Sequence, residues 1–211
     1  MVLYKRETLD DYAEHLRHHS DEIKALYEEI LIHVTSFFRD PEVFDNLKKL
    51  VFPTITQNKS AEAPVRIWVG GCSTGEEVYS IAICLLEYLG DRNLSLQIQI
   101  FATEISEGEI GKARSGFYLE NRMLGVSEER RHRFFVPVET GGYRISKAVR
   151  ELCVFARHNL GIDPPFSNFD LISCRNVMIY LADPLQKRVF AIFHYSITPP
   201  DFFVSGTYDS L

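Results

Sequence analysis

Residues 65–86 have the sequence VRIWVGGCSTGEEVYSIAICLL, and this stretch decides the fold. The apolar run at 65–69 predicts a buried strand, a turn with three glycines follows at 70–75, and the apolar stretch after it has the length of a helix. Glycine lets the backbone approach a ligand closely, and a helix start presents unpaired N–H groups. We therefore expect a small cofactor to bind at this turn.

The residues of the turn narrow the class of cofactor. Gly70 and Gly75 have the spacing of a phosphate-binding P-loop, but Glu76 stands where its lysine is required. Cys72 replaces the second glycine of a dinucleotide fingerprint, which disfavours a nucleotide-dependent oxidoreductase. Acids at a helix start, here Glu76 and Glu77, suit a ligand that carries an ammonium group and hydroxyls. S-adenosyl-L-methionine is such a ligand.

A second strand is predicted at 97–103, where apolar and polar residues alternate, and it ends at Glu104. An acid at this position can hold a ribose. The alternative is a solvated acid at the end of a strand.

The pattern of the whole chain indicates a helical N-terminal unit at 1–55, a polar linker at 56–64 and a sheet domain at 65–211. In the sheet domain, predicted strands alternate with helical stretches, which indicates an α/β fold with a parallel sheet. Gly141 and Gly142 between apolar runs predict a hairpin in a β insertion at about 134–147. The strands of the main sheet are expected at 65–69, 97–103, 152–157, 169–174 and 202–205.

Composition and charge disfavour several classes of function. The 211 residues are 45% hydrophobic, enough for one sizeable core, and the net charge of −6 disfavours nucleic-acid binding. No stretch reaches the ~18 apolar residues of a membrane span and no signal peptide opens the chain, so we expect a cytoplasmic protein without membrane insertion. The four cysteines are widely spaced and the histidines scattered, so neither a disulfide nor a metal site is expected. The basic run 130–133 predicts a solvated helix turn, with partner docking as the alternative.

Several motifs are spread through the chain: TSFFRD at 35–40, GCSTGEE at 71–77, FATE at 101–104, KARSGFY at 112–118 and CRNVMIY at 174–180. Together they resemble the CheR chemotaxis methyltransferases, which methylate receptor glutamates with S-adenosyl-L-methionine. Residues 143–147 and 155–160 are most similar to the CheR domain of CheB/CheR fusion proteins. The resemblance implies a Rossmann-like methyltransferase sheet with a small N-terminal helical unit and a small antiparallel β insertion. In some members this insertion binds the C-terminal tether of a receptor. The alternative is that the insertion is purely structural.

The resemblance also implies ligands and residues. The methyl donor is S-adenosyl-L-methionine, the product is S-adenosyl-L-homocysteine, and the partner is a methyl-accepting chemotaxis receptor or a similar signalling protein. By resemblance, two dipeptides that begin with asparagine, at 159–160 and 176–177, contact the adenosyl group of the cofactor. Residues 35 and 39 contact its amino-acid end, and the acids at 77 and 104 bind its ammonium group or its ribose. The expected cofactor-binding residues are Thr35, Arg39, Gly71, Glu77, Glu104, Asn159, Leu160, Asn176 and Val177.

Arg39 and Tyr180 are the expected catalytic residues. A guanidinium holds a carboxylate with a planar fork, although Arg39 could instead cap the following helix. Tyr180 ends an apolar run, where a tyrosine is by default a core residue with its hydroxyl at the rim, and the resemblance implies a role at the methyl centre. The alternative to an enzyme is a signalling module that binds the cofactor without catalysis.

The chain departs from the family pattern at a few positions. His33, Val78 and Glu104 stand where the family often has asparagine, proline and aspartate, and none of the three forbids cofactor binding. The sequence ends at Leu211, shortly after the last expected strand, so we expect the terminal hairpin of the family's sheet to be missing.

Overall fold

The computed structural model describes residues 9–19, 21–23, 35–57, 59–60, 62–90, 96–199 and 202–206. The chain divides into two compact units, residues 1–34 and residues 35–211. In the first unit, α1 spans Leu9–His18, and the hydroxyl of Tyr12 donates a hydrogen bond to Glu22 at 2.8 Å. The family departure at His33 and the chain end at Leu211 both lie outside the described residues.

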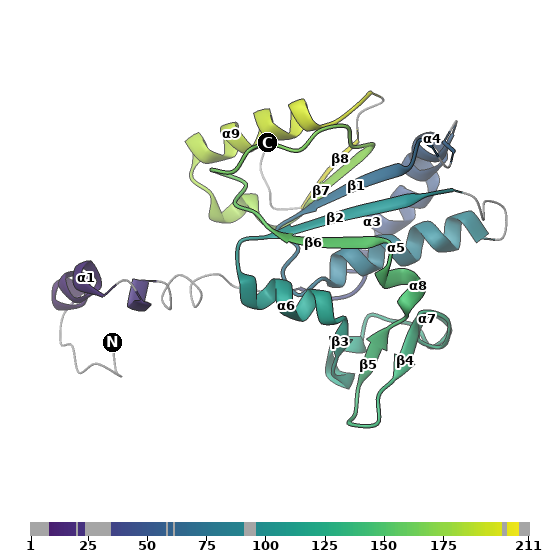
Figure 1. Ribbon diagram of the computed structural model, residues 1–211, viewed down its shortest axis with the longest axis horizontal. Helices are drawn as coiled ribbons and strands as arrows, with labels where there is room; N and C mark the ends of the chain where they lie inside the picture. Colours follow the sequence, from purple (N-terminus) through teal and green to yellow (C-terminus); the bar gives the residue numbers. More distant parts are fainter. Residues whose placement is uncertain are drawn as a thin grey trace. The chain divides into compact units, whose positions relative to one another are not determined.

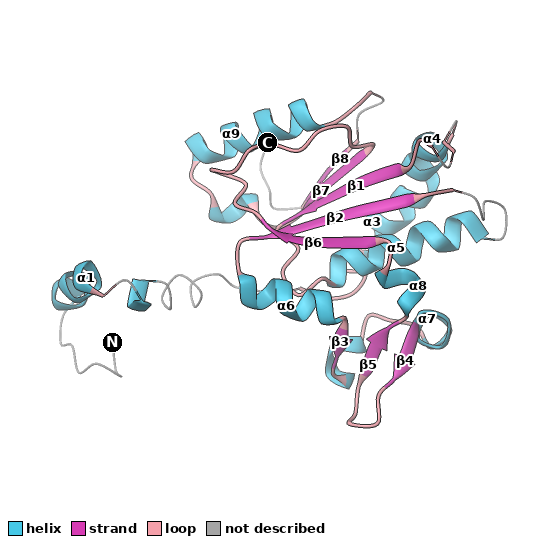
Figure 2. Ribbon diagram, viewed as in Figure 1, coloured by secondary structure: helices cyan, strands magenta, loops and turns pink. Residues whose placement is uncertain are grey.

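A parallel sheet forms the centre of the second unit, as the alternating pattern predicts (Figure 2). Its order among the described residues is β6-β2-β1-β7-β8, so the first strand in the chain lies in the middle. Each strand overlaps the range expected from the sequence. The strands are β1 (Val65–Gly70), β2 (Ile98–Glu104), β6 (Cys153–Arg157), β7 (Leu171–Cys174) and β8 (Phe203–Ser205).

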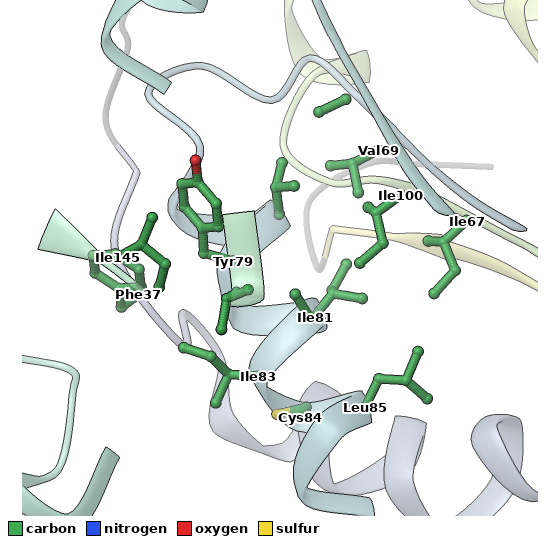
Figure 3. Close-up of a cluster of buried hydrophobic side chains, with 14 of the residues drawn as sticks. Phe37, Ile67, Val69, Tyr79, Ile81, Ile83, Cys84, Leu85, Ile100 and Ile145 are labelled. Carbon is green, nitrogen blue, oxygen red and sulfur yellow. The ribbon is translucent and has the colours of Figure 1, made fainter. Parts of the chain in front are cut away.

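Helices cover both faces of this sheet (Figure 1). On one face, α5 (Glu76–Leu89) lies against the sheet, and Figure 3 shows its Ile81 and Leu85 across from side chains of β1 and β2. On the other face, Trp68 of β1 makes an edge contact with Phe193 of α9 (Asp183–Ser196) at 5.2 Å between ring centres. Within the part of the chain that the structure describes, no helix is long and apolar enough to cross a membrane.

Residues 35–56 belong to the second unit, which corrects the N-terminal unit expected at 1–55. Phe37, Phe44 and Phe52 are buried in the same core as the strand β1. Helical spacing shows which face of a helix is apolar, but not which core that face joins, so the pattern predicts the boundary too late in the chain. The helices of this segment are α3 (Pro41–Asn46), the π-helix η2 (Leu47–Val51) and α4 (Phe52–Thr56).

The segment expected to be a linker is tied to the sheet at one described residue. Lys59 pairs with Asp170, which directly precedes β7, at 2.7 Å. The same carboxylate accepts the backbone N–H of Arg66 in β1 at 2.9 Å. This is the amino end of β7, opposite to the carboxyl ends of the strands, where the glycine turn lies.

A small antiparallel sheet is inserted between α6 (Glu107–Ser115) and β6, in the order β3-β5-β4. The predicted hairpin is present, and Pro137 lies in the edge strand. The insertion begins at Phe117 rather than at 134, because a strand of two residues has no alternation that a pattern could reveal. Its elements are β3 (Phe117–Tyr118), η4 (Glu120–Met123), α7 (Glu128–Phe134), β4 (Phe135–Pro137), β5 (Tyr143–Ile145) and α8 (Lys147–Arg150).

The basic run in α7 is only partly solvated, contrary to the prediction. Arg130 donates two hydrogen bonds to Glu87 of α5, at 2.7 and 2.9 Å, and its guanidinium lies 3.9 Å from the ring centre of Phe38. Burial opposes ionisation of Glu87, but the bonds from Arg130 and Lys48 outweigh it and lower the pKa of this carboxyl. The helix therefore joins the insertion to the core, and His132 and Arg133 remain exposed.

Candidate functional site

The strand ends that carry the expected site residues lie at one edge of the sheet. The register pairs Gly70 with Thr103, Glu104 with Arg157, and Val69 with Ser173. The four parallel strands β1, β2, β6 and β7 therefore end together. Ligands of open α/β sheets bind outside the carboxyl ends of the strands.

The glycine turn brings β1 and β7 into close contact. Gly71 has φ 69°, a left-handed conformation that favours glycine. A Cβ atom at this position would also overlap Cγ2 of Val177, which follows β7. Two expected cofactor-binding residues thus touch each other, and the absence of a side chain at Gly71 is what allows the contact.

The small sheet holds the second half of the turn. The hydroxyl of Tyr118 donates to the carbonyl oxygen of Thr74 at 2.7 Å, and it lies 3.2 Å from where a Cβ atom on Gly75 would be. Burial raises the pKa of Tyr118, so its hydroxyl keeps the proton that it donates. The family motif at 112–118 contains this tyrosine, but its sequence position alone does not reveal the contact.

Glu104 is buried beneath the turn. Its carboxylate accepts the backbone N–H groups of Ser73 at 3.0 Å, Ile105 at 2.7 Å and Ser106 at 3.2 Å. These bonds exclude the solvated strand-end acid that was the alternative. Each carboxylate oxygen has more than one acceptor site, so the group can still accept bonds from ribose hydroxyls. Burial, followed by the charge of Glu104, raises the pKa of Cys72, so that thiol stays neutral.

The two acids at the start of α5 have different surroundings. Glu77 accepts a hydrogen bond from the hydroxyl of Ser173 at 2.7 Å, and its other oxygen lies 3.5 Å from Nη1 of Arg175. Glu76 is fully buried and pairs with Arg122 of η4 at 2.7 Å. Glu77 therefore lies at the strand edge, whereas the carboxylate of Glu76 is paired with the insertion.

The loop after β6 contributes an apolar side chain and a folded backbone. Leu160 lies 3.5 Å from where a Cβ atom on Gly70 would be, so it packs beside the start of the glycine turn. The side-chain oxygen of Asn159 accepts a hydrogen bond from the backbone N–H of Gly161 at 2.9 Å, and the backbone N–H of Asn159 donates to the carboxylate of Asp163 at 2.8 Å. These bonds fix the loop that presents Leu160.

The loop before α3 reaches the same edge through its backbone. The carbonyl oxygen of Arg39 accepts a hydrogen bond from Arg175, at the end of β7, at 2.9 Å. Phe38 and Asp40, on either side of Arg39, have φ 52° and 58°. Thr35, which is the first residue of this unit, is half-buried.

Two further expected residues follow β7. Asn176 has φ 57°, in the left-handed region that asparagine tolerates better than most residues. Tyr180 ends η5 (Met178–Tyr180) with 48% of its surface exposed, so it is a rim residue rather than a core residue. Both lie on the segment that also carries Val177.

Arg175 was not among the expected site residues, although it contacts two of them. It lies inside the motif at 174–180, where a charged residue directly follows a buried strand. That position is the signal that could have identified it, because a charged side chain is almost never fully buried unless it has a partner.

The apolar side chains and carboxylates at this edge fit S-adenosyl-L-methionine. Leu160 and Val177 offer apolar contacts for the flat adenine ring next to Gly70 and Gly71, where the turn has no side chains. Glu104 can accept hydrogen bonds from the ribose hydroxyls, and Glu77 can accept hydrogen bonds from the ammonium group. Carboxylates in place of lysine or arginine at the turn are unsuited to phosphate, in agreement with the exclusion made from the sequence.

The doubly wound sheet, the glycine turn and the carboxylates together define a Rossmann-like methyltransferase domain. Residues 33–211 match the family described as "CheR methyltransferase, SAM binding domain". The chain belongs to this family, so its cofactor is S-adenosyl-L-methionine and the sequence-based identification as a methyltransferase is confirmed.

The chain is similar to several individual proteins. The chain is 32% identical over 198 residues to a chemotaxis protein methyltransferase of Listeria monocytogenes, covering 93% of this chain and 72% of the relative. It is 35% identical over 203 residues to an uncharacterized 104.1 kDa protein of Rhodobacter capsulatus, covering 96% of this chain but only 21% of that protein. Among solved structures, it is similar to the CMeT domain of the citrinin polyketide synthase, with 15% identity, a TM-score of 0.49, and coverage of 77% and 34% of the two chains.

Proposed function

We propose that this chain transfers a methyl group from S-adenosyl-L-methionine to glutamate side chains of a methyl-accepting chemotaxis receptor or a similar signalling protein. The observation that carries the proposal is the attachment of the Arg39 loop, through Arg175, to the strand edge that also holds Glu77 and the glycine turn. Arg39 on that loop suits an anionic acceptor, because a guanidinium binds a carboxylate with a planar fork. Relatives named chemotaxis protein methyltransferases support a role in chemotaxis, with the cytoplasmic location expected from the sequence.

The reaction needs no strong general base. The bound cofactor supplies a methyl group on a positively charged sulfur. A glutamate side chain has a reference pKa of about 4.3, so it is already ionised near neutral pH. In the proposal Glu77 binds the ammonium, Glu104 the ribose, and Arg39 orients the acceptor carboxylate. Such alignment of reactants is worth roughly 7–11 kcal/mol.

The rim of the site has a separate role in this proposal. Tyr180 is half exposed, and in the proposal its ring excludes water from the reacting carboxylate while its hydroxyl stays at the edge. Excluding water strengthens the interaction between the acceptor carboxylate and Arg39.

The proposal is tested with methyl-labelled cofactor and a cytoplasmic receptor fragment. We expect label in the fragment that is released in mild alkali, because a glutamate methyl ester is labile to base. A fragment with its acceptor glutamates replaced by glutamine is the control. Binding of S-adenosyl-L-homocysteine without transfer to any fragment would instead favour the non-catalytic signalling module.

A further inference from the structure

The side chain of Arg175 joins three segments around the site. It is only 2% exposed. Nη2 donates to the carbonyl oxygen of Arg39 at 2.9 Å and to the carboxylate of Asp40 at 2.5 Å. Nη1 lies 3.5 Å from the carboxylate of Glu77. One guanidinium thus connects the end of β7, the start of α5 and the loop before α3.

Stability alone does not account for an arginine at this position. Among the described residues, Nε of Arg175 is buried without a hydrogen-bond partner. Burying a charge and leaving one of its donors unpaired costs free energy, and a well-packed apolar side chain is often as stable. What an apolar side chain or a lysine lacks is the planar fork that reaches both Asp40 and Glu77.

The loop that Arg175 holds is locally strained. Phe38 and Asp40 both have positive φ, and such residues keep that conformation only where the surroundings impose it. The hydroxyl of Ser80 in α5 accepts the N–H of Phe38 at 3.0 Å, on one side of Arg39. Arg175 binds the other side, at the carbonyl oxygen of Arg39 itself and at Asp40.

We propose that Arg175 is a positioning residue for methyl transfer, which fixes the Arg39 loop relative to Glu77. The proposal rests on the function proposed above, in which Arg39 orients the acceptor and Glu77 binds the ammonium of the cofactor. Arg175 does not touch the acceptor. It sets the separation between the group that orients the acceptor and the group that binds the donor.

The test compares Arg175→Lys with Lys59→Gln, which removes a part-buried ion pair at the opposite end of β7. In Arg175→Lys we expect kcat to fall about 10- to 100-fold, because small misplacements of reacting groups have effects of that size. The affinity for S-adenosyl-L-homocysteine should change less than about threefold, since Glu104 and the glycine turn are intact. Lys59→Gln should keep kcat even if it lowers the melting temperature.

A second variant tests the link through Asp40, and it keeps the test valid if Arg175→Lys does not fold. Asp40→Asn changes a partly exposed side chain and leaves Arg175 in place. It should also lower kcat, and the double variant should be within about twofold of Arg175→Lys, because the two residues act through one contact. Full additivity of the two effects would overturn the proposal.

Amide hydrogen exchange provides a readout that needs no catalysis. In Arg175→Lys, or in Asp40→Asn, the amides of residues 37–40 should exchange at least about tenfold faster than in the wild type, and Lys59→Gln should leave them unchanged. If the wild-type protein transfers no methyl group, the proposed function fails while this measurement still decides whether Arg175 holds the loop. Unchanged exchange and unchanged kcat in both variants would overturn the inference.

Discussion

Glu104 accepts the backbone N–H of Ser73 at 3.0 Å, so the end of β2 holds the glycine turn that follows β1. The carboxylate is buried, and its other oxygen binds the two amides that begin the next loop. One acidic side chain therefore shapes the turn and, in the proposed function, also binds the ribose of the cofactor.

The first prediction concerns this carboxylate. Glu104→Ala removes the acceptor of three backbone donors and, in the proposal, of the ribose hydroxyls. A lost hydrogen bond to a charged group costs ~1.5–3 kcal/mol, so the affinity for S-adenosyl-L-homocysteine should fall at least about tenfold in calorimetry. Glu109→Ala is the control, because Glu109 is also buried but pairs with Lys112 on α6. An unchanged dissociation constant in Glu104→Ala would remove Glu104 from the site.

The second prediction separates backbone strain from steric overlap at the glycine turn. Gly71→Ala introduces a Cβ atom at positive φ and forces it against Val177. Gly141→Ala in the hairpin also has positive φ, but a Cβ atom there meets nothing within 4 Å. Both should lose about 1–3 kcal/mol of stability from strain. Only Gly71→Ala should abolish cofactor binding, and equal binding by the two variants would show that the contact of Gly71 with Val177 is not part of the cofactor site.

The third prediction concerns the expected catalytic residues. Arg39→Ala and Tyr180→Phe should lower kcat far more than they weaken cofactor binding, because both act on the acceptor in the proposed function. Arg39→Lys should restore activity only in part, since lysine keeps the charge without the planar fork. Replacement of the exposed His132 by alanine should leave all parameters unchanged. Wild-type kcat in either Arg39→Ala or Tyr180→Phe would show that residue to be structural.

The fourth prediction concerns pH. The pKa of Glu87 is lowered in the folded protein, so its ionised form stabilises the fold above the unfolded value of about 4.3, and this stabilisation is lost as the pH falls through the folded value. At neutral pH, the free energy of unfolding of Glu87→Gln should be about 1–3 kcal/mol lower than that of the wild type. In denaturant titrations this difference should shrink below about pH 4. The exposed Glu139→Gln is the control, and a difference that grows in acid would contradict the assignment.

Local patterns identified the elements of the main sheet because its strands are short apolar runs with clear ends. The glycine turn at Gly71 and the acid at Glu104 were found for the same reason, since each lies where a strand ends. Contacts between distant segments were not accessible in this way. The burial of Phe37 with the sheet, the pairing of Glu76 with Arg122, and the binding of the Arg39 loop by Arg175 all depend on how separate elements pack.

The same limit explains the error at α7. Three arginines and a histidine in a row, after an acidic helix start, are typical of a solvated helix turn. Arg130 instead covers Phe38 and pairs with Glu87, which is 43 residues away in the sequence. A charge run shows how many cations a helix carries, but not which of them have partners.

In the proposed function, the methyl acceptor is a glutamate side chain. The most direct measurement is peptide mass spectrometry that locates the transferred methyl group after the wild-type protein, S-adenosyl-L-methionine and a receptor fragment are incubated together. The account predicts one added methyl group on a glutamate residue, absent with Arg39→Ala and lost on treatment with alkali. A methyl group found on a nitrogen atom, or none on any fragment although S-adenosyl-L-homocysteine binds, would contradict it.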